Sequence, residues 1–205
     1  MLYGMDIYYL ILVVPALIIA MIAQAKVQSA YNKYSKVMSQ RGYNAAEITR
    51  RILDDNGLSG IRVEAVSGSL TDHYDPKAGV IRLSDSVRNS SSVAAIGVAA
   101  HEAGHAVQRK ENYAPIRWRN AVLPVVNFAS YAALPLALIG YIFGNVLMTV
   151  GIILFSVTVL FQLITLPVEF DASNRALKTL SENGYLEGEE LSGAKKVLQA
   201  AAMTY

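Results

Sequence analysis

The chain has 205 residues, no cysteine and a formal net charge of +2. Hydrophobic residues make up 53% of it and charged residues only 17%, whereas a soluble domain carries about 25% charged residues. This composition excludes a disordered chain, and the lack of cysteine excludes a disulfide scaffold, a cysteine-ligated metal and thiol catalysis. The mild charge argues against nucleic-acid binding. A membrane protein with a modest polar domain remains.

The first apolar run, residues 7–25, contains no charged residue. It is long enough to cross a bilayer, which takes about 20 apolar residues. A cleaved signal peptide would need positive charge before the run and small residues at its end. Residues 23–25 (Ala-Gln-Ala) resemble such an end, but the charge before the run is Asp6 and the lysines begin after it, at Lys26. We therefore predict a retained N-terminal transmembrane anchor over 1–25.

Residues 26–43 are predicted to continue this first span as a helix. A second helix should begin after Asn44, whose side chain can cap it together with Glu47 three residues later. This helix should end at Asn56-Gly57, because glycine readily adopts the left-handed conformation that closes a helix.

Three short β-like runs follow, and turn-forming residues separate them. They lie at 61–66, 70–74 and 80–83. The last run directly precedes the next predicted helix. It is either an ordinary strand or an exposed edge that pairs with an extended peptide. A serine cluster at 90–92 then supplies a cap for that helix.

This helix, predicted over about 93–109, carries the sequence H-E-A-G-H at 101–105. Residues four apart lie on the same helix face, so His101 and His105 can bind one zinc ion. Glu102 lies on the neighbouring edge of that face, where it can reach a zinc-bound water instead of the metal. The small glycine between the two histidines allows another element to approach closely.

The stretch 121–168 contains no Asp, Glu, Lys or Arg. It accommodates two helical spans, at about 122–143 and 146–167, with a turn at Gly144-Asn145. A soluble domain of this size could not cover so much apolar surface. We therefore predict a transmembrane hairpin over 121–168.

A catalytic zinc ion usually has three protein ligands and a water. No third histidine follows His105 in the spacing of the metzincins, so the third ligand should be a carboxylate from elsewhere. Glu169 is the first charge after the hairpin, and the hairpin returns to the side from which it started. Glu169 is therefore the leading candidate and Asp171 the alternative. A helical region over 169–205 should carry this ligand, with helices over 169–183 and 188–205.

Lysines and arginines follow the first span, precede the second and follow the third, while the loop between the second and third has none. Positive charge near span ends favours the cytoplasm. This pattern predicts a multi-pass protein of the cell membrane with its N-terminus outside. The catalytic region, residues 26–120, and residues 168–205 are expected inside.

The combination of H-E-A-G-H, two spans and then L-P-V-E-F-D-A-S-N-R-A resembles the YugP-like family of membrane zinc metallopeptidases. Residues 67–84 (SGSLTDHYDPKAGVIRLS) are similar to that family's segment before the active helix. The likeness covers nearly the whole chain. More distantly, the chain resembles HtpX-type and prenyl-protease metallopeptidases, which place two spans between H-E-x-x-H and a glutamate ligand.

This resemblance implies that His101, His105 and Glu169 bind Zn²⁺ and that Glu102 is the catalytic base. It implies an α+β membrane protein, with three transmembrane helices and a small zincin-like (gluzincin) domain that has a short β-sheet and the H-E-x-x-H helix over 26–120. The expected partners are a peptide or protein substrate and the lipid bilayer, with no nucleic acid. The sequence indicates no oligomeric state.

The chain departs from these relatives in two places. The wider relatives have an aspartate four residues after the ligand glutamate, where this chain has Ser173, so Asp171 or Asn174 is expected to supply the missing support. Family members also often continue into another apolar segment, so we expect this sequence, which ends at Tyr205, to lack a final span.

The predicted reaction is peptide hydrolysis by a zinc-activated water. His73, Tyr74 and Arg175 are candidates for stabilising the oxyanion. Each has a simpler interpretation: a histidine in a turn flanked by aspartates often forms local hydrogen bonds, and Arg175 can be an inside-positive anchor.

Two alternative functions compete with a surface peptidase. In an intramembrane site-2-type metalloprotease the zinc helix would lie within the bilayer, but 93–107 is too short to span, Arg109-Lys110 follow at once, and the later spans hold no Asp-Gly motif. A non-catalytic membrane scaffold would leave the His-Glu-His pattern unexplained.

Overall fold

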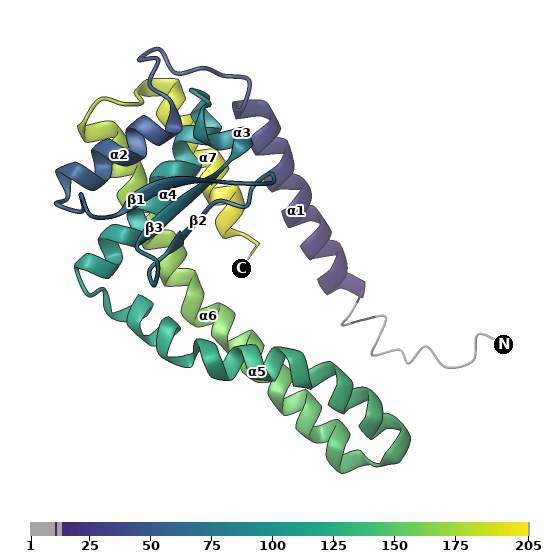
Figure 1. Ribbon diagram of the computed structural model, residues 1–205. Helices are drawn as coiled ribbons and strands as arrows, with labels where there is room; N and C mark the ends of the chain where they lie inside the picture. Colours follow the sequence, from purple (N-terminus) through teal and green to yellow (C-terminus); the bar gives the residue numbers. More distant parts are fainter. Residues whose placement is uncertain (1–10, 12–13, 205) are drawn as a thin grey trace.

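The computed structural model describes residue 11 and residues 14–204 (Figure 1). This part of the chain is mostly helical, and its strands form one small sheet. Three of its helices, α1, α5 and α6, are long and apolar enough to cross a membrane. The elements in chain order are α1 (Val14–Tyr34), α2 (Ala45–Asp55), β1 (Arg62–Val66), β2 (His73–Asp75), β3 (Val80–Ser84), α3 (Asp85–Arg88), α4 (Val93–Lys110), α5 (Ala114–Phe143), α6 (Asn145–Glu182) and α7 (Gly188–Ala202).

The first predicted span begins at residue 7, so its residues 7–10, 12 and 13 lie outside the described residues, and α1 covers the span from Val14 onward. The prediction that the helix continues to residue 43 was wrong, because α1 ends at Tyr34. The following segment pairs with the loop before α4 instead. Ser39 donates its N–H to the carbonyl of Ser91 at 2.9 Å, and the N–H of Val93 donates to the carbonyl of Val37 at 2.8 Å. These bonds require an extended backbone.

The second helix follows the prediction closely. The Asn44 side chain accepts from the N–H of Glu47, and the Glu47 carboxylate accepts from the N–H of Asn44, so the capping box is complete. Past the end of α2, Gly57 has φ +63°. This is the left-handed conformation that glycine adopts without strain.

The sheet has the order β1-β3-β2, with β1 parallel and β2 antiparallel to β3. Because β3 is central, both of its edges are paired, and the hypothesis that residues 80–83 bind a peptide as an exposed edge was wrong. Strand β2 is at one edge of the sheet. It is shorter than the predicted run 70–74 and ends one residue later. It lies beside α4.

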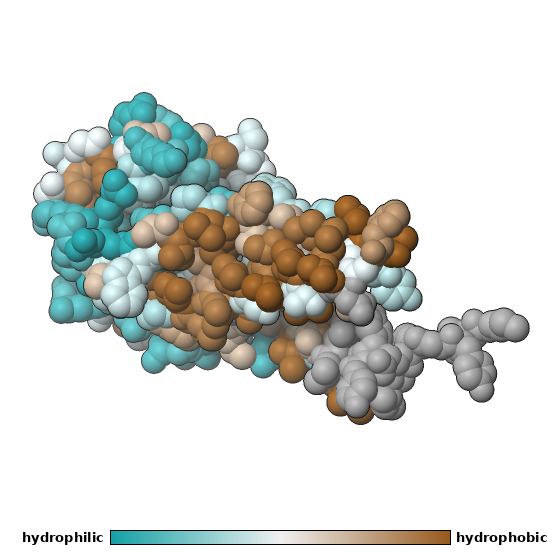
Figure 2. Space-filling view, turned by 90° about the horizontal axis from the view of Figure 1, so that it is seen from below, coloured by the Kyte–Doolittle hydropathy of each residue, from teal (hydrophilic) through white to brown (hydrophobic). Residues whose placement is uncertain are grey.

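Helices α5 and α6 form an antiparallel hairpin that projects from the rest of the molecule (Figure 1). Their backbones approach so closely that a Cβ atom on Gly140 would lie 2.0 Å from the backbone nitrogen of Met148. Figure 2 shows apolar side chains gathered in a broad surface, with hydrophilic residues at the other end of the molecule. Exposed apolar side chains of the hairpin include Phe128, Leu134, Phe143, Ile153, Phe155 and Leu163.

The third predicted span and the predicted helix over 169–183 are one continuous helix, α6. Its C-terminal part leaves the hairpin and packs against α4 and α7. Helix α4 in turn lies between α2, the sheet, α6 and α7, and its Ile96 is completely buried in their shared core. This packing places Glu169, which belongs to α6, close to α4.

Candidate functional site

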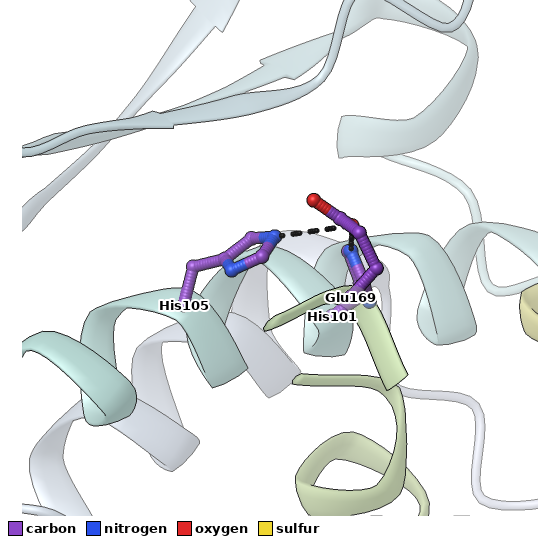
Figure 3. A group of neighbouring side chains, drawn as sticks. All are labelled: His101, His105 and Glu169. Atoms are coloured by element: carbon purple, nitrogen blue, oxygen red, sulfur yellow. Dashed lines mark hydrogen bonds and ion pairs between the residues drawn. The ribbon is translucent and has the colours of Figure 1, made fainter. Parts of the chain in front are cut away.

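The two histidines of the H-E-A-G-H sequence lie on α4. The Ser92 side chain caps this helix by accepting from the N–H of Ala95 at 3.3 Å. The helical period then places the imidazoles of His101 and His105 on one face, with ring centroids 4.6 Å apart. Figure 3 shows both rings pointing toward the carboxylate of Glu169, which comes from α6.

Gly104 lets α4 and α6 approach closely enough for the histidines to face Glu169. A Cβ atom at this position would lie 2.7 Å from the backbone carbonyl oxygen of Ala172. Ala172 is one helical turn after Glu169, so this contact sets the distance between the glutamate and the histidines. The glycine in the motif is therefore required by tertiary packing.

Glu169 is almost fully buried between the histidines. Its Oε2 atom lies 3.1 Å from Nε2 of His101 and 3.6 Å from Nε2 of His105. One ligand atom from each of the three residues lies within 4.8 Å of the others, a grouping that could hold a metal ion. Glu169 lies 64 positions after His105 in the sequence, and the hairpin brings the two side chains together.

Gln108 determines which nitrogen of His105 faces the site. Its buried amide donates to the carbonyl of Val168 and to Oδ2 of Asp171, both at 2.8 Å. The amide oxygen must then face Nδ1 of His105, 3.0 Å away, and this nitrogen donates to it. In the neutral ring, Nε2 of His105 therefore carries the lone pair and faces Glu169, as a metal ligand requires.

Ser173 supports the other histidine. Its hydroxyl lies 3.1 Å from Nδ1 of His101, which leaves Nε2 of that ring facing Glu169. The serine thus occupies the position where the wider relatives have an aspartate. Of the two expected substitutes, Asp171 supports His105 through Gln108, and Asn174 lines a cavity on another side of α4.

The charges of the group favour a cation. Although burial lowers the pKa of His105, its hydrogen bond to Glu169 and the nearby carboxylates of Glu102 and Glu169 raise it above its ordinary value. In the neutral form of both rings, two lone pairs and one carboxylate converge on one point. Two imidazoles and one carboxylate are a donor set that fits Zn²⁺.

Glu102 lies beside the three donors and is not one of them. Its Oε2 atom accepts from the backbone N–H of Tyr74 at 2.9 Å, so β2 holds the carboxylate at the sheet side of α4. Together with His101, His105 and Glu169 it lines a cavity of about 200 Å³, which we call the polar cavity. The cavity has room for a water or a small part of a substrate beside the donors.

The candidate oxyanion donors lie in different places. His73 and Tyr74 line the polar cavity, and the ring of His73 contacts the carbonyl of Thr71 at 2.8 Å and the Arg82 guanidinium at 3.3 Å. Arg175 instead lines the cavity on another side of α4. It pairs with Asp171 and Glu111, each at 2.5 Å.

Local sequence patterns did not reveal the contacts of Gln108 or the positions of Arg109 and Arg119 at the polar cavity. Gln108 lies three residues after His105 on the same helix face, a spacing that could have indicated its contact. Arg109 and Arg119 line the polar cavity, and in the described part of the chain the Nε atom of Arg119 is buried without a hydrogen-bond partner. Only the packing of α5 beside α4 reveals that these two charges share a cavity.

Comparisons with known proteins relate the chain to proteins whose descriptions mention zinc or a membrane. Residues 9–205 match the sequence profile of a family described as "Putative neutral zinc metallopeptidase". The chain is also 50% identical over 198 residues to a Bacillus subtilis (strain 168) protein described as "Putative membrane protease YugP", which covers 96% of this chain and 88% of that protein. No solved structure matches the chain.

Proposed function

Because the chain belongs to this family of neutral zinc metallopeptidases, we propose that it is a membrane-bound, zinc-dependent endopeptidase of the gluzincin type. The observation that carries the proposal is the convergence of His101, His105 and Glu169 on one point, with Glu102 beside them. A structural zinc site is usually closed by four protein ligands. Three donors next to a cavity are instead typical of a catalytic site.

In this proposal His101, His105 and Glu169 hold the zinc ion. When bound, zinc lowers the pKa of a water ligand to about 7 and polarises a carbonyl group. Glu102 takes the proton of the attacking water and delivers it to the leaving amine. Its hydrogen bond from the N–H of Tyr74 keeps the carboxylate oriented toward the polar cavity.

The negative charge that develops on the substrate carbonyl needs positive or donor groups nearby. His73 and the guanidinium groups of Arg109 and Arg119 line the polar cavity and are the residues we propose for this role. Arg175 is held by two carboxylates and lines a different cavity. We therefore assign Arg175 to supporting the site through Asp171.

We also propose that the protein is a multi-pass protein of the cell membrane with its catalytic region, residues 26–120, on the cytoplasmic side. The three long apolar helices support the spanning segments, and the lysines and arginines at their ends support the orientation. The C-terminal part of α6 then carries Glu169 out of the bilayer to α4.

The proposal is tested with the full chain purified in nanodiscs. Metal analysis should find one zinc ion per chain, and His101→Ala should remove it. Glu102→Gln should keep the zinc and lower kcat toward a peptide mixture by about 10²- to 10⁴-fold. Glu189→Gln, at an exposed position in the first turn of α7, is the matched control. Unchanged activity in Glu102→Gln would refute the mechanism.

A further inference from the structure

A second hollow adjoins the metal donors and borders the polar cavity. It has a volume of about 240 Å³ and shares Asp72, His101, Glu102 and Glu169 with the polar cavity. The rest of its lining is almost entirely apolar, and we call it the apolar pocket. Its apolar lining residues are Val27, Leu70, Val98, Leu198, Ala201 and Ala202.

These residues come from segments far apart in sequence. Val27 belongs to the membrane anchor helix α1, Val98 to α4 one turn before His101, and Leu198, Ala201 and Ala202 to α7. Helices α1 and α7 pack against each other and against α4. The pocket is therefore built by the tertiary packing of three helices beside the metal donors.

Leu70 adds an independent observation. It lies between β1 and β2, and its backbone has φ +57°, a conformation that is uncommon for any residue with a side chain. Its side chain lines the pocket and is still 41% exposed. Residues with a strained backbone cluster at active sites and ligand-binding positions, and Leu70 lines this pocket.

Resting on the proposed function, we propose that the apolar pocket receives an apolar side chain of the substrate, from one of the two residues that flank the cleaved bond. A peptide whose carbonyl lies in the polar cavity places a neighbouring side chain beside His101 and Glu169, where the pocket opens. A pocket that holds a drug-sized ligand has about 300–1,000 Å³. The smaller volume fits one side chain such as leucine.

The first test measures binding and needs no cleavage. The zinc-loaded protein in nanodiscs is titrated by calorimetry with leucine hydroxamate and with glycine hydroxamate, which share a zinc-binding group. Burial of the leucine side chain should make its hydroxamate bind about 10- to 100-fold more tightly. Equal affinity of the two compounds would overturn the pocket assignment.

The second test maps cleavage sites in a peptide library by mass spectrometry. Wild-type protein should prefer a large apolar residue at one flanking position. Ala201→Leu, which fills the pocket, should shift that preference to alanine or glycine and leave zinc content unchanged. Ala200→Leu, on the same helix but outside the pocket lining among the described residues, should keep the wild-type profile. An unchanged profile in Ala201→Leu would overturn the proposal.

Leu70→Gly guards against a folding defect. Glycine adopts a positive φ readily, so this variant should be at least as thermostable as wild type. It should nevertheless reduce the affinity ratio of the two hydroxamates by several-fold. An unchanged affinity ratio in Leu70→Gly would overturn the assignment of the apolar pocket to a substrate side chain. A preference for leucine hydroxamate that changes with the acyl-chain length of the nanodisc lipid would overturn it as well.

The two proposals fail in different ways. A protein that binds zinc and prefers leucine hydroxamate but cleaves no peptide would refute the peptidase and keep the pocket. A protein that cleaves peptides with no apolar preference would refute the pocket and keep the peptidase.

Discussion

Gly104→Ala is the substitution that most directly tests how the helices assemble the site. The added Cβ atom would lie 2.7 Å from the carbonyl oxygen of Ala172, where ordinary contacts begin at 3.4 Å. The helices must then separate by about 0.7 Å, the difference between those two distances. Both contacting atoms belong to rigid backbone or are attached directly to it, so rotation of a side chain cannot relieve the clash.

The consequence for the metal follows from the position of Ala172. It lies one turn after Glu169 on α6, so a displacement of α6 at Ala172 moves the carboxylate away from both histidines. Metal–ligand distances tolerate deviations of about 0.2 Å, which is less than a third of that displacement. We therefore expect zinc affinity to fall by about 10- to 100-fold. Overpacking costs about 1–3 kcal/mol, of which the better helix propensity of alanine offsets about 1 kcal/mol.

Gly97→Ala is the matched control on the same helix. There the added Cβ atom would meet the Cβ atom of Ala194 at 3.4 Å, which is ordinary contact. This variant should keep its zinc affinity and unfold at the same or a slightly higher temperature. Zinc affinity is measured by competition with a chromophoric chelator and stability by thermal unfolding. Wild-type zinc affinity in Gly104→Ala would refute the reasoning.

Three further predictions concern the histidine support, pH and topology. Gln108→Leu should weaken zinc binding by about 10- to 100-fold in the same chelator competition, whereas exposed Gln199→Leu should not. The pKa of His105 is raised in the metal-free site, and zinc binds the neutral ring. Zinc affinity should therefore fall as the pH falls through this pKa, by about tenfold per pH unit for each proton displaced. A flat profile of zinc affinity between pH 8 and pH 5.5 would contradict this. In intact cells a membrane-impermeant maleimide should label Tyr141→Cys near the hairpin tip and leave Lys77→Cys unlabelled, and the reverse pattern would invert the topology.

The metal-free protein should show the opposite pH dependence in its stability. A folded-state pKa above the unfolded value means that protonated His105 stabilises the fold. This contribution is present below the unfolded pKa and is lost as the pH rises through the folded pKa. Thermal unfolding of the chelator-treated protein across this range measures it.

Local features of the sequence were sufficient for much of the fold. The capping box at Asn44 and Glu47, the charge-free stretch 121–168 and the four-residue spacing of His101 and His105 each depend on neighbours within one or two helical turns. Such short-range geometry is nearly independent of the rest of the chain. The end of α1 at Tyr34 was missed because it depends on pairing with the distant segment 91–93.

The types of the candidate donor groups, the helix that carries two of them and the apolar segments on either side follow from local sequence patterns. The positions of β3 at the centre of the sheet and of β2 beside Glu102, the contacts of Ser173 and Gln108 with the imidazoles, and the apolar pocket between α1 and α7 do not follow from these patterns. Periodicity fixes only where a side chain lies on its own helix. Which helices meet, and how closely, depends on packing between residues that are far apart in the chain.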